Sequence, residues 1–276
     1  MAAEAAGQVE EPEGGRKALG KAARRRWRPG LRGGWKRALA RWFLPLQTSL
    51  LFCGDSHLAP IWKGYKAGLF GTRHARCVLV AGATARGLGN PRSATGARQK
   101  YLEVLLPPAP RVVPVFLLGE VDCSSVVWLR SAAAGTDPAD ELVRSVTVYL
   151  SFLDEVLAAG YRRILVLAAP LPTVEGSDHH RAHSILRRDI TATLRERTEL
   201  TRRFNQAVAE GCRLRGIDFL DLTAAWTDPT TGLVADRFRA RDPLDHHLDE
   251  EAAAPVWVAA IRRALRWPRW RDARRG

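Results

Sequence analysis

Short apolar runs separated by longer helical patterns organise the chain from residue 46 onward. Each run is compact and rich in Val, Leu and Ile, and several end at Gly or Asp. This pattern is typical of strands that are buried on both faces of a parallel sheet. The five runs are TSLLFCG (48–54), ARCVLVAG (75–82), RVVPVFLLGEV (111–121), RRILVLAAP (162–170) and IDFLDLT (217–223).

Helical patterns lie between and after the later runs. Residues 137–160 open with an Asp-Pro cap signal, residues 189–216 are amphipathic, and both segments end at a Gly. Residues 249–266 carry acids in the first turn and arginines in the last, as the helix dipole favours. Strands that alternate with helices predict an α/β fold, a three-layer, flavodoxin-like, doubly wound parallel sheet of about five strands.

Polar clusters close several of the apolar runs. Parallel strands end at one edge of a sheet, and ligands of doubly wound folds bind at that edge. We therefore expect the clusters to share one rim and to supply the functional site. They are Gly54-Asp55-Ser56-His57, Gly82-Ala83-Thr84, Gly119-Glu120-Val121-Asp122 and, before the last helix, Asp245-His246-His247.

The positive charge of the chain is concentrated at its two ends. Of a net +14, residues 1–45 hold 11 Lys/Arg against 4 acids, and residues 262–276 hold 7 Arg against one Asp. The body between them is nearly neutral. We expect a basic, disordered extension (1–45), one α/β domain (46–268) and a basic tail (269–276). Basic ends allow contact with an anionic surface, but no specific nucleic-acid partner is predicted.

The four cysteines are scattered without a CxxC pair, which favours reduced thiols over a disulfide framework. No window approaches 18 consecutive apolar residues, and the first apolar segment serves better as a strand than as a secretory signal. We therefore expect a cytoplasmic protein. Peripheral membrane contact through the basic, Trp-bearing segment before residue 46 is the alternative.

Nucleophilic acyl transfer needs a hydroxyl, a base, a group that orients the base, and donors for the oxyanion. Ser56 is the candidate nucleophile, His247 the base and Asp245 the orienting carboxylate. The N–H groups of Ser56 and of the glycines after the second run are candidate oxyanion donors. The chain has no G-x-S-x-G elbow, so the α/β-hydrolase arrangement is not expected.

The whole pattern resembles the SGNH (GDSL-like) hydrolase family over roughly residues 48–260. GDSH looks like the family's first block, AGATARGL (81–88) like the second, GEVD stands where G-x-N-D belongs, and DHHL where D-x-x-H belongs. The resemblance implies a serine esterase or O-acyltransferase without a cofactor. It assigns an oxyanion role to Gly82 or Gly87. The combination of GDSH, GEVD and DHHL further implies acyl esters of a glycan or polysaccharide as substrates.

Two positions depart from the family pattern. Val121 stands where the family has an oxyanion-hole Asn, and a valine side chain donates no hydrogen bond. In the last block Asp245 precedes His247 by two residues instead of three, so His246 and Asp242 remain alternatives for the base and its partner. The other polar residues of the rim are candidate substrate contacts: Asp55, His57, Glu120, Asp122 and His246.

These departures leave a second interpretation open, a non-catalytic SGNH-like module that binds a glycan or a partner protein. No metal site is expected. His179 and His183 have the spacing of metal ligands on a helix, but no second set of ligands accompanies them. A third hypothesis, nucleic-acid binding through the basic ends, predicts an affinity that falls steeply with salt.

Overall fold

The computed structural model describes residues 48–71, 73–175 and 190–266. Their strands form one parallel sheet in the order β2-β1-β3-β4-β5. This is the flavodoxin-like order, in which the chain leaves β1 toward one edge and returns to β3 on its other side. The strands are β1 (Ser49–Gly54), β2 (Ala75–Leu79), β3 (Val112–Leu117), β4 (Leu165–Leu167) and β5 (Asp218–Leu220).

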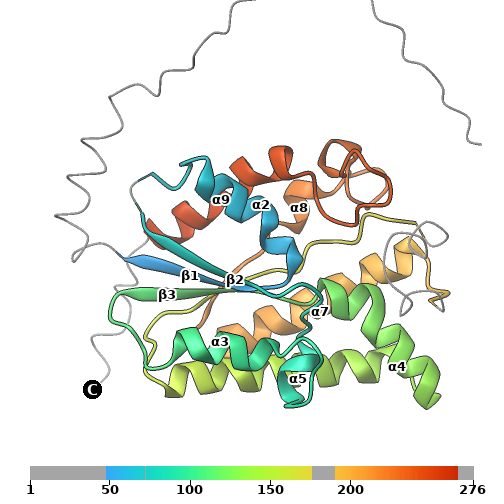
Figure 1. Cartoon of the computed structure of the whole chain (residues 1–276). Coiled ribbons are helices and arrows are strands. Elements are labelled where there is room, and N and C mark those ends of the chain that lie inside the picture. Colours follow the sequence, from blue (N-terminus) through green and yellow to red (C-terminus); the bar gives the residue numbers. More distant parts are fainter. Residues whose placement is uncertain (1–47, 72, 176–189, 267–276) are drawn as a thin grey trace, which may run out of the picture.

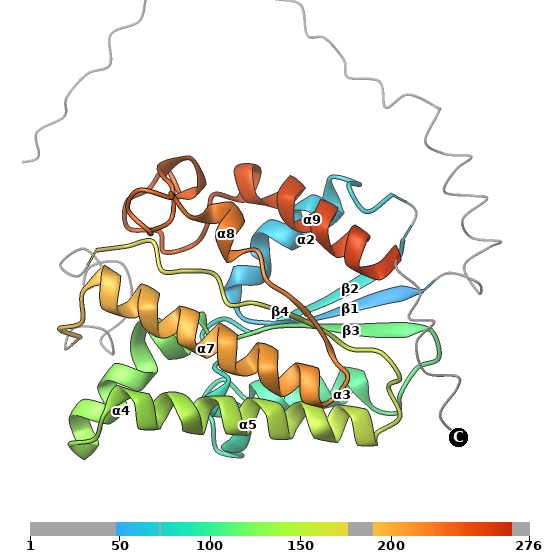
Figure 2. The same ribbon diagram turned by 180° about the vertical axis from the view of Figure 1, so that it is seen from behind.

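Helices cover both faces of the sheet. Figures 1 and 2 show α2, α8 and α9 on one face and α3, α5 and α7 on the other. The predicted three-layer α/β architecture is therefore confirmed. The helices are α2 (Ala59–Lys66), α3 (Ala97–Leu105), α4 (Val127–Ala134), α5 (Pro138–Ala158), α7 (Leu194–Leu214), α8 (Thr223–Trp226) and α9 (Glu250–Arg266).

The interior strand β1, which lies between β2 and β3, is buried on both faces, as its unbroken apolar run predicts. Leu50 and Phe52 belong to the core beneath α2 and α9, where they pack with Trp257. Leu51 and Cys53 belong to the opposite core beneath α3, α5 and α7. Successive side chains of a strand point to opposite faces, so one strand serves two cores.

Two of the three predicted helices start near their expected positions, and one starts later. Asp137 caps α5 by accepting a hydrogen bond from Ala139 N at 2.7 Å. Helix α7 begins at Leu194 and not at residue 189, because Thr193 and Glu196 form a capping box there. The sequence patterns did not identify α2, α3 or α4, which are only eight or nine residues long, or the four-residue α8.

Helices α2 and α9 pack closely against each other at Gly64. A Cβ atom at this position would lie 2.7 Å from Val258 Cγ2 and 3.5 Å from Ala254 Cβ. Helix α2 directly follows the Ser56 turn, and α9 directly follows the Asp245–His247 segment. The separation of these two helices therefore influences how the two halves of the site meet.

Some sequence-based expectations fall outside the described residues. These are the basic extension (1–45), the basic tail (269–276) and the pair His179 and His183. Within the described segments, no helix has both the length and the apolar character needed to cross a bilayer.

Candidate active site

The turn after β1 is held in place by its own residues. A Cβ at Gly54 would lie 2.3 Å from Leu117 O, so only glycine allows β1 and β3 to approach this closely. Asp55 caps the following 3-10 turn η3 (Ser56–Leu58) by accepting a hydrogen bond from His57 N at 2.9 Å. Ser56 begins the turn and is half-buried. The first N–H groups of a helical turn lack intrahelical partners, so the Ser56 N–H remains a candidate donor to an oxyanion.

Asp245 and His247 form the pair that the sequence predicts. His247 Nδ1 lies 2.6 Å from Asp245 Oδ1, which also accepts a hydrogen bond from His247 N at 3.0 Å. Burial lowers the pKa of His247, and the neighbouring His57 lowers it further. The imidazole is therefore neutral near pH 7, and its bond to the carboxylate places the proton on Nδ1. Nε2 then carries the lone pair that a general base needs.

The alternative acid, Asp242, does not take part in this pair. Its Oδ1 accepts a hydrogen bond from Leu244 N at 2.9 Å and shapes the turn that leads to Asp245. His246, the alternative base, is buried with its ring centroid 5.2 Å from that of His57.

Ser56 and His247 are brought to the same part of the rim without a direct hydrogen bond. His247 Nε2 is shielded from solvent and has no hydrogen-bond partner among the described residues. His57, the residue after Ser56, has its ring centroid 4.7 Å from that of His247. In free enzymes the bond between nucleophile and base is often long and shortens only when substrate binds. The arrangement therefore remains compatible with proton transfer from Ser56.

His57 and Glu120 form a second histidine–carboxylate pair near the first. Glu120 Oε2 is 2.8 Å from His57 Nε2, and both side chains are almost completely buried. The sequence places both residues at the rim but does not show that they bind each other. The strand order supplies the missing information, because β1 and β3 are neighbours and their ends are adjacent.

Asp122 ties the loop after β2 to the end of β3. Its two carboxylate oxygens accept hydrogen bonds from Ala85 N at 2.7 Å and from Arg86 N at 2.9 Å. The carboxylate is fully buried, and this burial raises its pKa to about 6. Asp122 therefore fixes the loop that carries Gly82 and Gly87.

The structure separates the two candidate oxyanion donors on this loop. Gly87 N already donates a hydrogen bond to Thr84 Oγ1 at 2.8 Å. Gly82 is exposed and adopts a φ of 70°, a conformation that favours glycine. Gly82 is thus the better placed of the two to donate to a substrate. Val121 is buried at the start of the π-helical turn η5 (Asp122–Val126) and adds no side-chain donor.

Asp55 has an unusual environment for a carboxylate. It is almost fully buried, Oδ1 accepts from His57 N, and Oδ2 has no hydrogen-bond partner within the described segments. Burial raises the pKa of Asp55 to about 7, against the opposing influence of His57. A direct substrate contact from this residue stays a prediction.

Solved structures with a similar fold include hydrolases. Est24, a carbohydrate acetylesterase from Sinorhizobium meliloti, is 13% identical and superposes over 80% of this chain and 100% of its own with a TM-score of 0.53. A predicted acylhydrolase from Bacteroides fragilis is 13% identical over 79% of this chain and 86% of its own, with a TM-score of 0.51. The expected hydrolase fold is confirmed.

A GDSL-like lipase from Bacteroides thetaiotaomicron is also similar, with 11% identity, coverage of 83% of this chain and 98% of its own, and a TM-score of 0.48. No protein-family model and no curated protein matches the chain. Likeness at this level of identity establishes the fold alone, so the chemistry has to be derived from the site.

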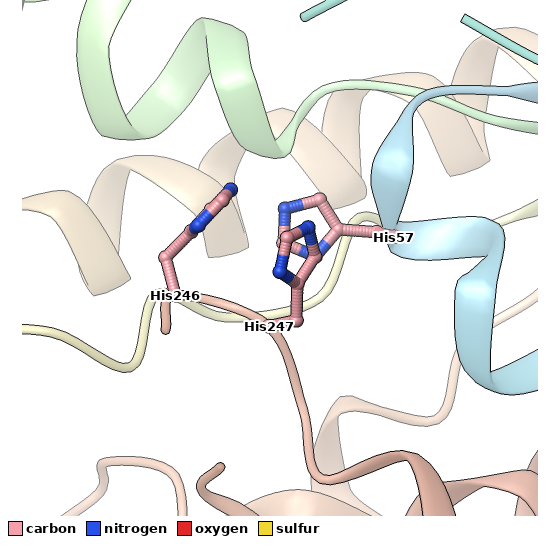
Figure 3. A group of neighbouring side chains, drawn as sticks. All are labelled: His57, His246 and His247. Atoms are coloured by element: carbon pink, nitrogen blue, oxygen red, sulfur yellow. The ribbon is translucent and has the colours of Figure 1, made fainter. Parts of the chain in front are cut away.

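Three histidines of the site also lie close enough together to be considered as metal ligands. One ring nitrogen from each of His57, His246 and His247 lies within 4.8 Å of those of the other two. Figure 3 shows the three side chains converging from two separate segments of the chain.

Proposed function

We propose that the chain is a serine esterase that cleaves acyl esters, with Ser56 as nucleophile, His247 as general base and Asp245 as its orienting group. The observation that carries this proposal is the Asp245–His247 pair, whose 2.6 Å bond leaves Nε2 as the basic atom on the rim that also bears Ser56. The shared fold with hydrolases adds support.

In the proposed reaction His247 Nε2 takes the hydroxyl proton of Ser56 while Oγ attacks the acyl carbon. Asp245 stabilises the imidazolium that forms. The carbonyl oxygen becomes an oxyanion that accepts hydrogen bonds from the N–H groups of Ser56 and Gly82. His247 then gives the proton to the departing alcohol oxygen. Water attacks the acyl-Ser56 by the same route and releases the acid.

This oxyanion hole has one hydrogen-bond donor fewer than a site with a side-chain donor, because the side chain of Val121 cannot donate. Loss of one donor lowers kcat by about 10²–10³-fold. A slow esterase, or an acyltransferase whose acceptor sugar adds contacts of its own, is the expected result. The carbohydrate acetylesterase among the structural neighbours supports acetyl groups on a glycan as the substrate class.

A fluorophosphonate probe tests the proposal. The purified full-length chain should be labelled, whereas Ser56→Ala and His247→Ala should not be. Ser151→Ala, which changes an exposed serine of α5, is the matched control and should be labelled like the unchanged chain. Absence of labelling in a folded, metal-free chain would sink the proposal.

A binding module is the second candidate function. It is favoured by Val121 and by the absence of a hydrogen bond to His247 Nε2 among the described residues. Such a module would bind acetylated oligosaccharide without turning it over, and Ser56→Ala would not weaken binding. Substrate turnover that depends on Ser56 would exclude it.

A further inference from the structure

The three histidines of the rim form a more compact group than the esterase mechanism requires. The ring centroids of His246 and His247 are 3.9 Å apart, and those of His57 and His247 are 4.7 Å apart. In Figure 3 His57 comes from one segment of the chain and His246 and His247 from another, and the rings of His57 and His247 overlap in this view. A serine esterase uses one imidazole as its base, so the other two are not needed as a base in that reaction.

Two of the three rings are oriented by carboxylates. Asp245 binds His247 through Nδ1, and Glu120 binds His57 through Nε2. Metal-bound histidines almost always have such an outer partner, which fixes the ring and raises its basicity. The two carboxylates also balance the charge of a divalent cation.

We propose that His57, His246 and His247 together bind a divalent transition-metal ion such as Zn²⁺. Imidazole suits this class of metal, whereas Mg²⁺ and Ca²⁺ prefer oxygen ligands. His247 coordinates through Nε2, because Asp245 holds its Nδ1, and His57 and His246 each supply one ring nitrogen. Three protein nitrogens leave the fourth position of a tetrahedral ion open to water or a small anion.

The distances require a modest contraction. Zn²⁺–N bonds of about 2.0–2.1 Å place tetrahedral ligand atoms roughly 3.4 Å apart. The histidine nitrogens lie within 4.8 Å of one another. Rotations of the three side chains about their χ angles, with Glu120 and Asp245 following the rings that they bond, are therefore needed to close the site.

Metal binding and the esterase reaction compete for one lone pair. Zn²⁺ on His247 Nε2 prevents that atom from accepting the proton of Ser56. Bound metal therefore inhibits the proposed esterase. The metal site itself rests on the three imidazoles and their carboxylates, so it stands independently of Ser56 chemistry.

Cobalt provides a direct test, because four-coordinate Co²⁺ has strong visible absorption. The full-length chain is dialysed against a chelator, titrated with Co²⁺, and then with Zn²⁺ to displace it. We expect one Co²⁺ per chain. The affinity should fall by at least about 100-fold in His57→Gln, His246→Gln and His247→Gln, and by about 10–100-fold in Glu120→Gln.

Matched variants locate the site. His74→Gln changes an exposed histidine before β2. A triple His179→Gln, His180→Gln, His183→Gln variant removes the other histidines. Both should keep the cobalt spectrum, as should Ser56→Ala. Circular dichroism checks that each variant is folded, and His247→Gln, which replaces the least buried of the three ligands, is the variant least prone to misfold.

Absence of a cobalt spectrum in the folded chain, or a spectrum unchanged in both His246→Gln and His247→Gln, would overturn the metal site. Inhibition of ester turnover by one equivalent of Zn²⁺, reversed by chelator, would support it. A chain that binds Co²⁺ but never labels with fluorophosphonate when metal-free would refute the esterase and leave the metal site standing. A chain that labels with fluorophosphonate but binds no Co²⁺ would refute the metal site and leave the esterase standing.

Discussion

Glu120 and His57 form a buried hydrogen-bonded pair across the ends of two neighbouring strands, with Oε2 and Nε2 2.8 Å apart. Their side chains are 1% and 2% exposed. The pair joins the turn that carries Ser56 to the end of β3. It therefore fixes the His57 ring directly beside the proposed nucleophile.

Replacing Glu120 should be costly because it leaves a buried polar partner behind. We expect Glu120→Ala to lower the free energy of unfolding by about 3–5 kcal/mol, and Glu120→Gln by less, since an amide still bonds the ring. Urea denaturation measures both. Glu103→Ala on α3, which removes an exposed Glu, should change stability by at most about 0.5 kcal/mol. Equal losses of unfolding free energy in Glu120→Ala and Glu103→Ala would contradict a stabilising role for the bond between Glu120 and His57.

Asp245→Asn should lower kcat strongly while the chain stays folded. The amide no longer stabilises the imidazolium and can present an N–H to His247 Nδ1, which favours the wrong tautomer. In serine proteases such a change costs about 10⁴-fold. Asp242→Asn is the matched control three residues away, and we expect near-normal turnover because Asn also caps the turn at Leu244. A larger loss for Asp242→Asn than for Asp245→Asn would reverse their roles.

Asp122 should make stability depend on pH in the acidic range. Burial raises its pKa from 3.8 to about 6, so the folded chain holds a proton there that the unfolded chain has already lost. The free energy of unfolding attributable to Asp122 therefore decreases as the pH rises from about 4 to about 6, by at most about 3 kcal/mol.

Urea denaturation of the unchanged chain and of Asp122→Asn across this pH range measures the effect. Asn does not titrate, so its curve should lack this slope, although other buried acids such as Asp55 still contribute. Parallel curves would show that Asp122 titrates at its ordinary value.

Gly64→Ala should disturb the site from a distance. The new Cβ would lie 2.7 Å from Val258 Cγ2 and force α2 away from α9. Ala is also the better helix former by about 1 kcal/mol, so the net change in stability should be small. Ser56 and His247 precede these two helices, and a misplacement of about 1 Å can cost roughly 10²-fold in rate.

Adding Val258→Ala to Gly64→Ala should restore space between the helices and recover most of the lost turnover. Val258→Ala alone serves as the control for the cavity that it creates. If Gly64→Ala leaves kcat unchanged, the spacing of α2 and α9 does not govern the site.

The sequence predicted the sheet well because buried parallel strands have a simple pattern. Five compact apolar runs correspond to β1 through β5, and their polar ends meet at one rim. The pairing of Asp245 with His247 was also predictable, because the two residues are close in sequence. Both predictions rest on residues that are close together in the sequence, and such contacts can be recognised without knowledge of the strand order.

Contacts between distant segments were harder to predict. The bond between His57 and Glu120 depends on the strand order, which apolar runs do not specify. The convergence of His57 with the two C-terminal histidines depends on the packing of α2 against α9, and α2 was not recognised. The sequence also leaves Gly87 as a candidate oxyanion donor, whereas in the structure its N–H donates a hydrogen bond to Thr84 Oγ1.

The packing of α2 against α9 also has a consequence for how activity arises during synthesis. The nucleophile turn is made early, but its base lies just before the last helix of the described chain. On the proposed mechanism, a nascent chain can complete much of its sheet while it still lacks its base, and it would gain turnover only after α9 has left the ribosome and docked. Ester cleavage would then report the final step of folding, and chains truncated before residue 245 would be folded in part but silent.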